Sequence, residues 1–149
     1  MEFFIIIIGI ILDRITKLWG INLLKKADGI SVIKGYFDFV YLENKGAAWG
    51  IMKDRTTLLS IITIIVLAAI IYYRIKTGTK SKLFRISFSL IVAGAVGNLF
   101  DRIYYRYVVD FISFHYKNVY YFPVFNVADM MVVCGTFLLA LWVLKDGRL

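Results

Sequence analysis

The chain of 149 residues contains one cysteine, one histidine and one proline, and two of these scarcities exclude a kind of site or structure. A single cysteine, Cys134, cannot form an internal disulfide, and its apolar surroundings in the sequence favour a packing role. A single histidine, His115, excludes a metal site built from several histidines. No recognisable loop supports a metal site made of carboxylates alone. We therefore expect neither a metal nor another cofactor.

Acidic residues are also scarce, with 10 Asp and Glu against 18 Lys and Arg, so the formal net charge is +8. In a soluble protein this charge would suggest nucleic acid, but no recognised nucleic-acid-binding module accompanies it. The basic residues lie beside long apolar runs, as expected for contact with anionic lipid headgroups. We expect membrane lipids as partners and no binding of nucleic acid.

Apolar residues are abundant: 60% of the chain is hydrophobic and the mean hydropathy is +0.76. A soluble domain is nearer half apolar, and about 20 helical residues cross a membrane core of ~30 Å. We predict an all-α integral membrane protein forming one membrane domain over residues 1–149, with four transmembrane helices at about 3–24, 57–74, 83–102 and 124–144. The first twelve residues lack the basic segment and cleavage site of a signal peptide, so we expect the first helix to be retained.

The short connection at about 75–82 indicates the topology. It and its flanks contain no acid and five basic residues, namely Arg74, Lys76, Lys80, Lys82 and Arg85. Such loops stay in the cytoplasm, so four spans would place both termini there as well. The connections at about 25–56 and 103–123 would then face outward.

Both outer connections contain segments typical of β-structure. Residues 31–42 are rich in β-branched and aromatic side chains and predict one or two strands. Residues 103–122 favour extended structure, which could pair with the first connection. After Asn44 we expect a short interfacial helix with Trp49 at the membrane surface, a plain turn being the alternative.

Unusual polar residues all fall at the predicted outer face. Pairs at i, i+3 or i, i+4 share one helix face, as in Asp13 with Lys17 and Asn126 with Asp129. The others lie at the end of the third span or in the outer connections: Asn44, Asn98, Asp101, Arg102 and Asp110. Burying such groups near lipid is costly, so we predict that they form one functional site. For Arg14 we expect instead that the side chain extends to the membrane surface.

Three kinds of catalytic chemistry could use the residues of this site. A serine–histidine triad would need Asp110, Ser113 and His115 to converge from one short segment, which disfavours it. A threonine–lysine pair fails because adjacent Thr16 and Lys17 point in different directions on a helix. Two carboxylates can share one proton, activate water and protonate a leaving amine. We interpret Asp110 and Asp129 as that pair.

Five blocks, at residues 13–17, 44–49, 97–102, 109–111 and 125–129, occur in an order that resembles bacterial lipoprotein signal peptidase (signal peptidase II). The resemblance implies an aspartic endopeptidase of the bacterial plasma membrane with four helices and a small outer β-structure. It would remove signal peptides from lipid-modified prolipoproteins by cutting before the diacylglyceryl-cysteine.

The resemblance also implies roles for single residues. Asp110 and Asp129 match the catalytic pair, and Asp101 matches a structural position that pairs with a nearby arginine or lysine. Seven others match residues that support the site or hold the substrate: Asp13, Lys17, Asn44, Gly46, Asn98, Arg102 and Asn126. We expect a monomer whose active site lies at the outer face.

Two rival functions use the same residues. A proton or ion transporter also needs carboxylates within the membrane, but here the polar residues stop at one face. A non-catalytic binding or assembly protein could hold a lipid or peptide at this site. Cleavage of a lipid-modified prolipoprotein would distinguish a peptidase from both.

Overall fold

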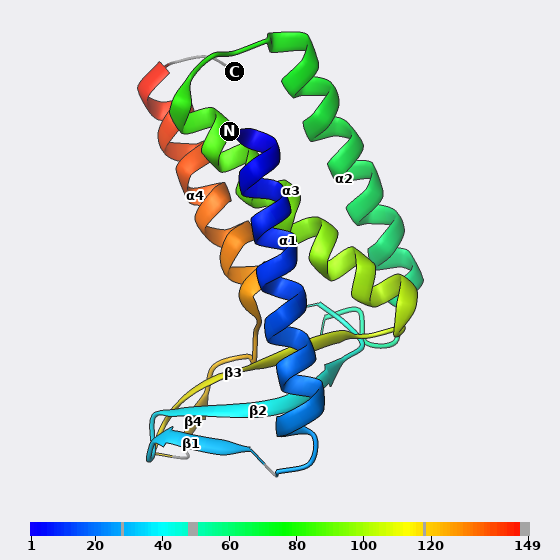
Figure 1. Cartoon of the computed structure of the whole chain (residues 1–149), viewed down its shortest axis with the longest axis vertical. Coiled ribbons are helices and arrows are strands. Elements are labelled where there is room, and N and C mark those ends of the chain that lie inside the picture. The colour runs from blue at the N-terminus through cyan, green and yellow to red at the C-terminus, as the bar shows by residue number, and fades with distance from the viewer. Residues whose placement is uncertain (28, 48–50, 118, 147–149) are drawn as a thin grey trace.

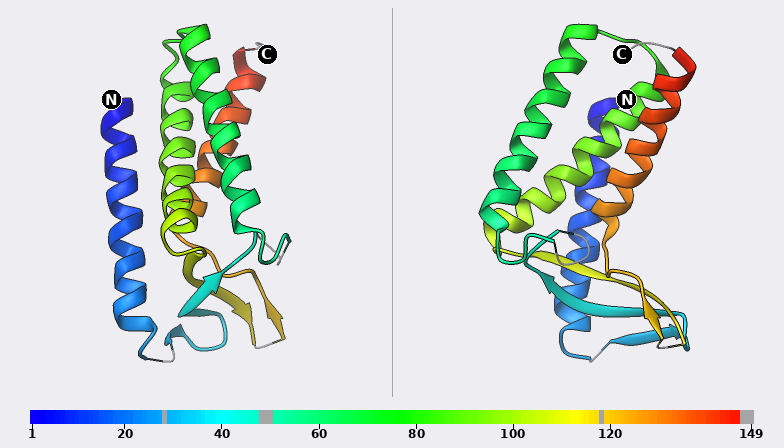
Figure 2. Two further views of the ribbon diagram at one scale, coloured as in Figure 1. Left: turned by 90° about the vertical axis from the view of Figure 1, so that its right-hand side faces the viewer. Right: turned by 180° about the vertical axis from the view of Figure 1, so that it is seen from behind.

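The computed structural model describes residues 1–27, 29–47, 51–117 and 119–146. Its helices stand side by side on a small β-sheet that covers one end of the bundle (Figure 1). The first residue, the α2–α3 connection and the end of α4 lie at the opposite end (Figures 1 and 2). The helices are α1 (Glu2–Trp19), its π-helical continuation η1 (Gly20–Leu24), α2 (Thr56–Thr77), α3 (Lys82–Tyr104) and α4 (Val127–Asp146).

Within the described residues, α2, α3 and α4 are long and apolar enough to cross a membrane. The α1 helix does not meet the same criterion, because its 18 residues include four charged ones: Glu2, Asp13, Arg14 and Lys17. The structure therefore agrees with a membrane protein, while the count of four spans stays a prediction. Most of the apolar surface of α2 points outward, as a surface in contact with lipid would.

The α3 helix lies at the centre of the bundle, packed against α1, α2 and α4. Its contact with α4 is close because Gly94 has no side chain. A Cβ atom there would collide with the carbonyl oxygen of Ala128 and with Val132. A glycine at this position lets the two helices approach each other closely. Toward the other end of α3, Phe84 and Phe88 pack with Trp142 in an apolar cluster.

The sheet has the order β1-β2-β3-β4 and is antiparallel throughout. Its strands are β1 (Ile30–Ile33), β2 (Phe37–Asn44), β3 (Val108–Tyr116) and β4 (Tyr120–Tyr121). The pairing of β2 with β3 confirms the prediction that the two outer connections pair. In this register Leu42 faces Asp110 and Asn44 faces Val108, so the end of β2 lies beside the start of β3.

The segment before α4 belongs to the sheet region. Phe125 forms an isolated bridge with Ile112, and the helix begins at Val127 instead of at the predicted residue 124. Asn126 is therefore the residue that precedes the helix. The expected interfacial helix falls partly on residues 48–50, including Trp49, which lie outside the described residues. Residues 51–54 form turns.

Candidate active site

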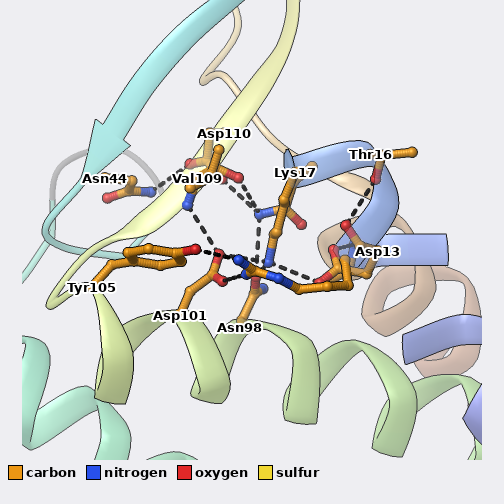
Figure 3. A network of polar contacts seen from close by, with 12 residues as sticks. Asp13, Thr16, Lys17, Asn44, Asn98, Asp101, Tyr105, Val109 and Asp110 are labelled. Atoms are coloured by element: carbon orange, nitrogen blue, oxygen red, sulfur yellow. Dashed lines mark hydrogen bonds and ion pairs between the residues drawn. The ribbon is translucent and has the colours of Figure 1, made fainter. Parts of the chain in front are cut away.

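Asp110 lies on β3, where the sheet meets the helices, and only 1% of its surface is exposed. Each of its carboxylate oxygens accepts a hydrogen bond from a carboxamide. Asn44 at the end of β2 donates to Oδ2 at 2.8 Å, and Asn126 donates to Oδ1 at 2.7 Å. Figure 3 shows Asn44 and Asp110 pointing toward each other from neighbouring strands. Two donors thus fix the orientation of a buried carboxyl group.

Asp129 lies in the first turn of α4 and is partly exposed. It forms a reciprocal pair with Asn126: the Asn126 backbone N–H donates to Asp129 Oδ2, and the Asp129 backbone N–H donates to Asn126 Oδ1. This arrangement caps the helix start and holds the carboxylate near the positive end of the helix dipole. The Asn98 amide donates to the other oxygen, Oδ1, at 2.7 Å.

Asn126 connects the two aspartates. Its Nδ2 lies 2.7 Å from Asp110 Oδ1 and 3.1 Å from Asn98 Oδ1, while Asn98 itself donates to Asp129. The same residue therefore contacts one carboxylate through its amide and the other through its backbone. The structure brings Asp110, Asp129, Asn44, Asn98 and Asn126 into one hydrogen-bonded group.

Lys17 is fully buried beneath this group, with 0% of its surface exposed. Its ammonium contacts Asp13 Oδ2 at 3.0 Å, Asp101 Oδ2 at 2.9 Å and Asn98 Oδ1 at 2.9 Å. All three of its donors have acceptors, which is the condition for a buried charge to be tolerated. The Asp13–Lys17 contact confirms that these residues share a helix face. Figure 3 shows both reaching from α1 toward α3.

Asp13 also joins α1 to α4, because its Oδ1 accepts the Ala128 backbone N–H at 3.1 Å. Its other oxygen lies against Gly97 of α3, where any Cβ atom would collide with the carboxylate. The sequence alone assigned no separate role to Gly97, the first residue of the block at 97–102. The structure shows that the space beside it holds a carboxylate.

Asp101 pairs with both Lys17 and Arg14, which confirms the prediction of a nearby basic partner. The expectation that Arg14 extends to the membrane surface is wrong. Its Nη1 lies 3.0 Å from Asp101 Oδ1, and its Nη2 donates to the Tyr105 hydroxyl. The reason is packing: α1 lies against α3, so an anionic partner is within reach of the guanidinium.

Gly46 shapes the turn that follows Asn44. Its backbone N–H donates to Asn44 Oδ1 at 2.9 Å, which leaves the Asn44 amide to donate to Asp110. A Cβ atom on Gly46 would lie 2.9 Å from the Ile51 carbonyl oxygen, so a side chain has no room. Gly46 is buried and supports Asn44 through its backbone.

The environment of Asp110 changes its acidity. Burial, and after it the nearby charge of Asp129, raise the pKa of Asp110 to about 7 against the opposing hydrogen bonds from Asn44 and Asn126. Burial disfavours the charged form of a carboxyl group, and a neighbouring carboxylate does the same. At neutral pH the pair can therefore share one proton, as acid–base catalysis by two carboxyl groups requires.

A groove of about 690 Å³ leads to this group between α2, α3 and α4. Its walls are mainly apolar, and Asn98, Arg102 and Asp129 contribute the polar part of the lining. Arg102 is partly buried, and its Nε is enclosed without a hydrogen-bond partner. The groove thus offers an apolar ligand both a carboxylate and an unpaired cationic donor.

The serine–histidine triad that the sequence disfavoured is not formed by Asp110 and His115. His115 Nε2 lies 2.8 Å from Asp38 Oδ2, so the histidine pairs with β2 and not with Asp110. In the described part of the chain, no group of three or more Cys, His, Asp or Glu side chains could hold a metal ion.

Sequence reasoning missed three contributors to the site: Arg14, Tyr105 and the backbone of Val109. The Val109 N–H donates to Asp101 Oδ2 at 3.2 Å, and its carbonyl lies 3.3 Å from Asn126 Nδ2. One signal was available for Tyr105, which follows Asp101 by four residues on the same helix face. No sequence signal marks a backbone group.

Comparison with known proteins gives consistent matches over nearly the whole chain. The profile of the family described as signal peptidase (SPase) II matches residues 5–145. The lipoprotein signal peptidase of Clostridium acetobutylicum is 54% identical over 149 residues, covering 99% of this chain and 97% of that protein. The lipoprotein signal peptidase of Clostridium novyi is 55% identical over 148 residues, covering 99% of this chain and 100% of that protein.

Two solved structures, each described as a bacterial membrane enzyme, share the fold. The first has a TM-score of 0.88 and 36% identity, covering 99% of this chain and 89% of that one. The second has a TM-score of 0.84 and 37% identity, covering 97% of this chain and 93% of that one.

Proposed function

Because the chain belongs to the signal peptidase II family, we propose that it is an aspartic endopeptidase that removes signal peptides from lipid-modified prolipoproteins. It would cut just before the diacylglyceryl-cysteine. The observation that carries the aspartic mechanism is the hydrogen-bonded link from Asp110 through Asn126 to Asp129. It holds two carboxyl groups from different elements together, and one of them, Asp129, lines the apolar groove.

In this mechanism the two carboxyl groups have opposite roles. Asp129, which accepts two hydrogen bonds and lies at a helix start, takes a proton from water as the water oxygen attacks the scissile carbonyl. Asp110, whose pKa is raised, would carry the proton that the pair shares and donate a hydrogen bond to the carbonyl oxygen. The carbon–nitrogen bond then breaks, and the proton held by Asp129 passes to the leaving amine.

Substrate binding would use the groove between α2, α3 and α4. Its apolar walls suit the hydrophobic part of a signal peptide, which would be buried there without losing hydrogen bonds. Arg102 would donate its free Nε–H to a carbonyl of the substrate near the cleavage site. Asn44 and Asn98, which hold the two aspartates, would keep the catalytic geometry during binding.

The setting of this activity is the bacterial plasma membrane. We propose four spans, with α1 as the first, both termini in the cytoplasm and the sheet at the outer face. The position of the sheet at the end of the bundle opposite the basic α2–α3 connection supports this orientation (Figure 2). We propose that the enzyme acts as a monomer in contact with membrane lipids. Nothing in the comparisons supports the transporter alternative.

The test of this proposal replaces each aspartate by asparagine. An amide keeps nearly the same shape but can neither take a proton from water nor share a proton with a second carboxyl group, so Asp110→Asn and Asp129→Asn should each lower turnover by roughly 10³-fold or more. The double variant should be hardly slower than either single one, because residues that act as a unit are not additive. The measurement is release of signal peptide from a lipidated prolipoprotein by purified protein in detergent.

Asp38→Asn is the matched control, since Asp38 lies on β2 and pairs with His115 away from the groove. It should retain turnover. Activity should also survive a metal chelator and a serine-directed acylating reagent. Turnover near the wild-type rate in either active-site variant would overturn the aspartic mechanism.

A further inference from the structure

Arg14 is a charged residue on α1 whose polar partners are Asp101 and Tyr105, not the two catalytic aspartates. Its guanidinium contacts Asp101 at 3.0 Å and the Tyr105 hydroxyl, and it lies over the rings of Phe100 and Tyr105 at 4.9 Å and 5.1 Å. Its side chain is 26% exposed, while that of Asp101 is 1% exposed. Several contacts thus fix the guanidinium. It is the more exposed partner of the ion pair and lies against the buried Asp101 carboxylate.

Asp101 links Arg14 to β3, the strand that carries Asp110 and is called the catalytic strand below. Its Oδ2 accepts the backbone N–H of Val109, the residue immediately before Asp110. The Asp101 carboxylate therefore joins α3 to β3 at the residue next to Asp110 (Figure 3). Displacement of Asp101 would change the position of the Asp110 backbone, and misplacement of a catalytic group by about 1 Å can cost on the order of 10²-fold in rate.

Arg14 also completes a charge balance around the pair. Three cations, Arg14, Lys17 and Arg102, stand among four carboxyl groups. When the catalytic pair holds one proton, three negative charges remain and the sum is zero. The groups that act on Asp110 directly are Asp129 from α4, Asn44 from β2, Asn126 before α4, Lys17 from α1 and Arg102 from α3. Arg14 and Asp101 reach it only through the backbone N–H of Val109. Removal of Arg14 would leave one negative charge uncompensated in a largely buried site.

We propose that Arg14 is a positioning residue for Asp110, acting through Asp101 to hold the catalytic strand and to keep the pair singly protonated near neutral pH. This inference rests on the proposed aspartic mechanism. It assigns a role in catalysis to a side chain that contacts neither aspartate.

The experiment compares Arg14→Gln and Arg14→Lys with wild type in the signal-peptide release assay between pH 5.5 and 9. Glutamine removes the charge, so Arg14→Gln should lower kcat by about tenfold at pH 6.5. The excess negative charge should also move the alkaline decline of kcat/KM upward by roughly half a pH unit or more. Lysine keeps the charge but cannot reproduce the forked donor, so Arg14→Lys should lower kcat and leave the alkaline decline in place.

Arg85→Gln is the matched control, because Arg85 near the start of α3 forms an ion pair with Glu2 at the start of α1 at 2.6 Å. Both helices begin at the end of the bundle opposite the sheet (Figure 1). It should change neither kcat nor the pH profile. A fall in rate for Arg14→Gln with an unchanged pH profile would mean a purely structural role and would overturn the proposal, as would wild-type behaviour. The asparagine variants of Asp110 and Asp129, measured in the same assay, separate the two hypotheses. If those variants are inactive, the aspartic mechanism stands, and either of these two Arg14→Gln results refutes only the role proposed for Arg14.

Discussion

At the scale of single residues, carboxamides hold the candidate site together. Asn44, Asn98 and Asn126 each donate to one of the two aspartates, and none of them adds charge. A carboxamide has both donor and acceptor atoms, so Asn126 can bond a carboxylate and cap α4 at once. An aspartate at position 126 has the same shape, but as a carboxylate it would offer Asp110 an acceptor and a further negative charge.

The raised pKa of Asp110 leads to a prediction about pH. A carboxyl group whose pKa is about 7 carries its proton below that pH and loses it above. The mechanism needs this proton, so kcat/KM for signal-peptide release should fall by about tenfold per pH unit above pH 7. Rates measured from pH 6 to 9, with thermal unfolding recorded at each pH as the control for folding, would check this. A rate that stays constant to pH 9 would show that Asp110 is not the proton donor.

At the scale of elements, α3 is the helix on which the site is assembled. It carries Asn98, Asp101 and Arg102 on its last turns, and it packs against both α1 and α4 through small residues. One of these contacts belongs to the candidate site, since Gly97 leaves space for the carboxylate of Asp13. Helix packing and site geometry are therefore coupled at this glycine.

Gly97→Ala tests that coupling. The added methyl group would collide with the Asp13 carboxylate and separate it from the Ala128 N–H, so the variant should lose roughly 1–3 kcal/mol of stability. Turnover should fall as well, because Asp13 shares Lys17 with Asn98. Thermal unfolding in detergent and the release assay are the two measurements.

Gly20→Ala is the control for this prediction, as another buried helical glycine. The heavy atoms nearest to a Cβ atom there belong to Phe111 and lie 3.7 Å away or more, which is an ordinary contact. This variant should fold and turn over like wild type. Equal stability of Gly97→Ala and wild type would show that α1 and α3 can separate at no cost.

At the scale of the whole molecule, the polar site and the basic connection lie at opposite ends of the bundle. This polarity predicts the membrane orientation. With cysteines introduced singly at Asn44, Thr79 and Lys117 in a Cys134→Ser background, an impermeant thiol reagent on whole cells should label positions 44 and 117 and spare position 79. Labelling at 79 with protection of the other two would contradict the orientation.

Labelling in permeabilised cells is the control, because all three cysteines should then react. It separates protection by the membrane from burial in the protein. The same assay bears on α1, since an outward position 44 and a cytoplasmic N-terminus require α1 to cross the membrane.

The sequence by itself determined the helices and the composition of the site. Apolar runs of about 20 residues specify helices through neighbours in the chain, and their bounds differ from the prediction by a few residues. The concentration of scarce carboxylates and carboxamides at one face indicated the candidate site, because polar groups near lipid are costly. Even the pairing of the two outer connections could be inferred, since both contain β-branched and aromatic residues.

Only the tertiary structure decided which groups meet. The Asp13–Ala128 bond joins residues 115 positions apart, and the Asn44–Asp110 bond joins residues 66 positions apart. Such contacts depend on how α1, α3 and α4 pack, which helical periodicity does not specify. For this reason the sequence did not predict the pairing of Arg14 with Asp101. It also did not predict that α4 begins at Val127, which follows because Phe125 pairs with β3. A helix face is determined by local spacing, whereas a hydrogen-bond partner is determined by the element that packs against that face.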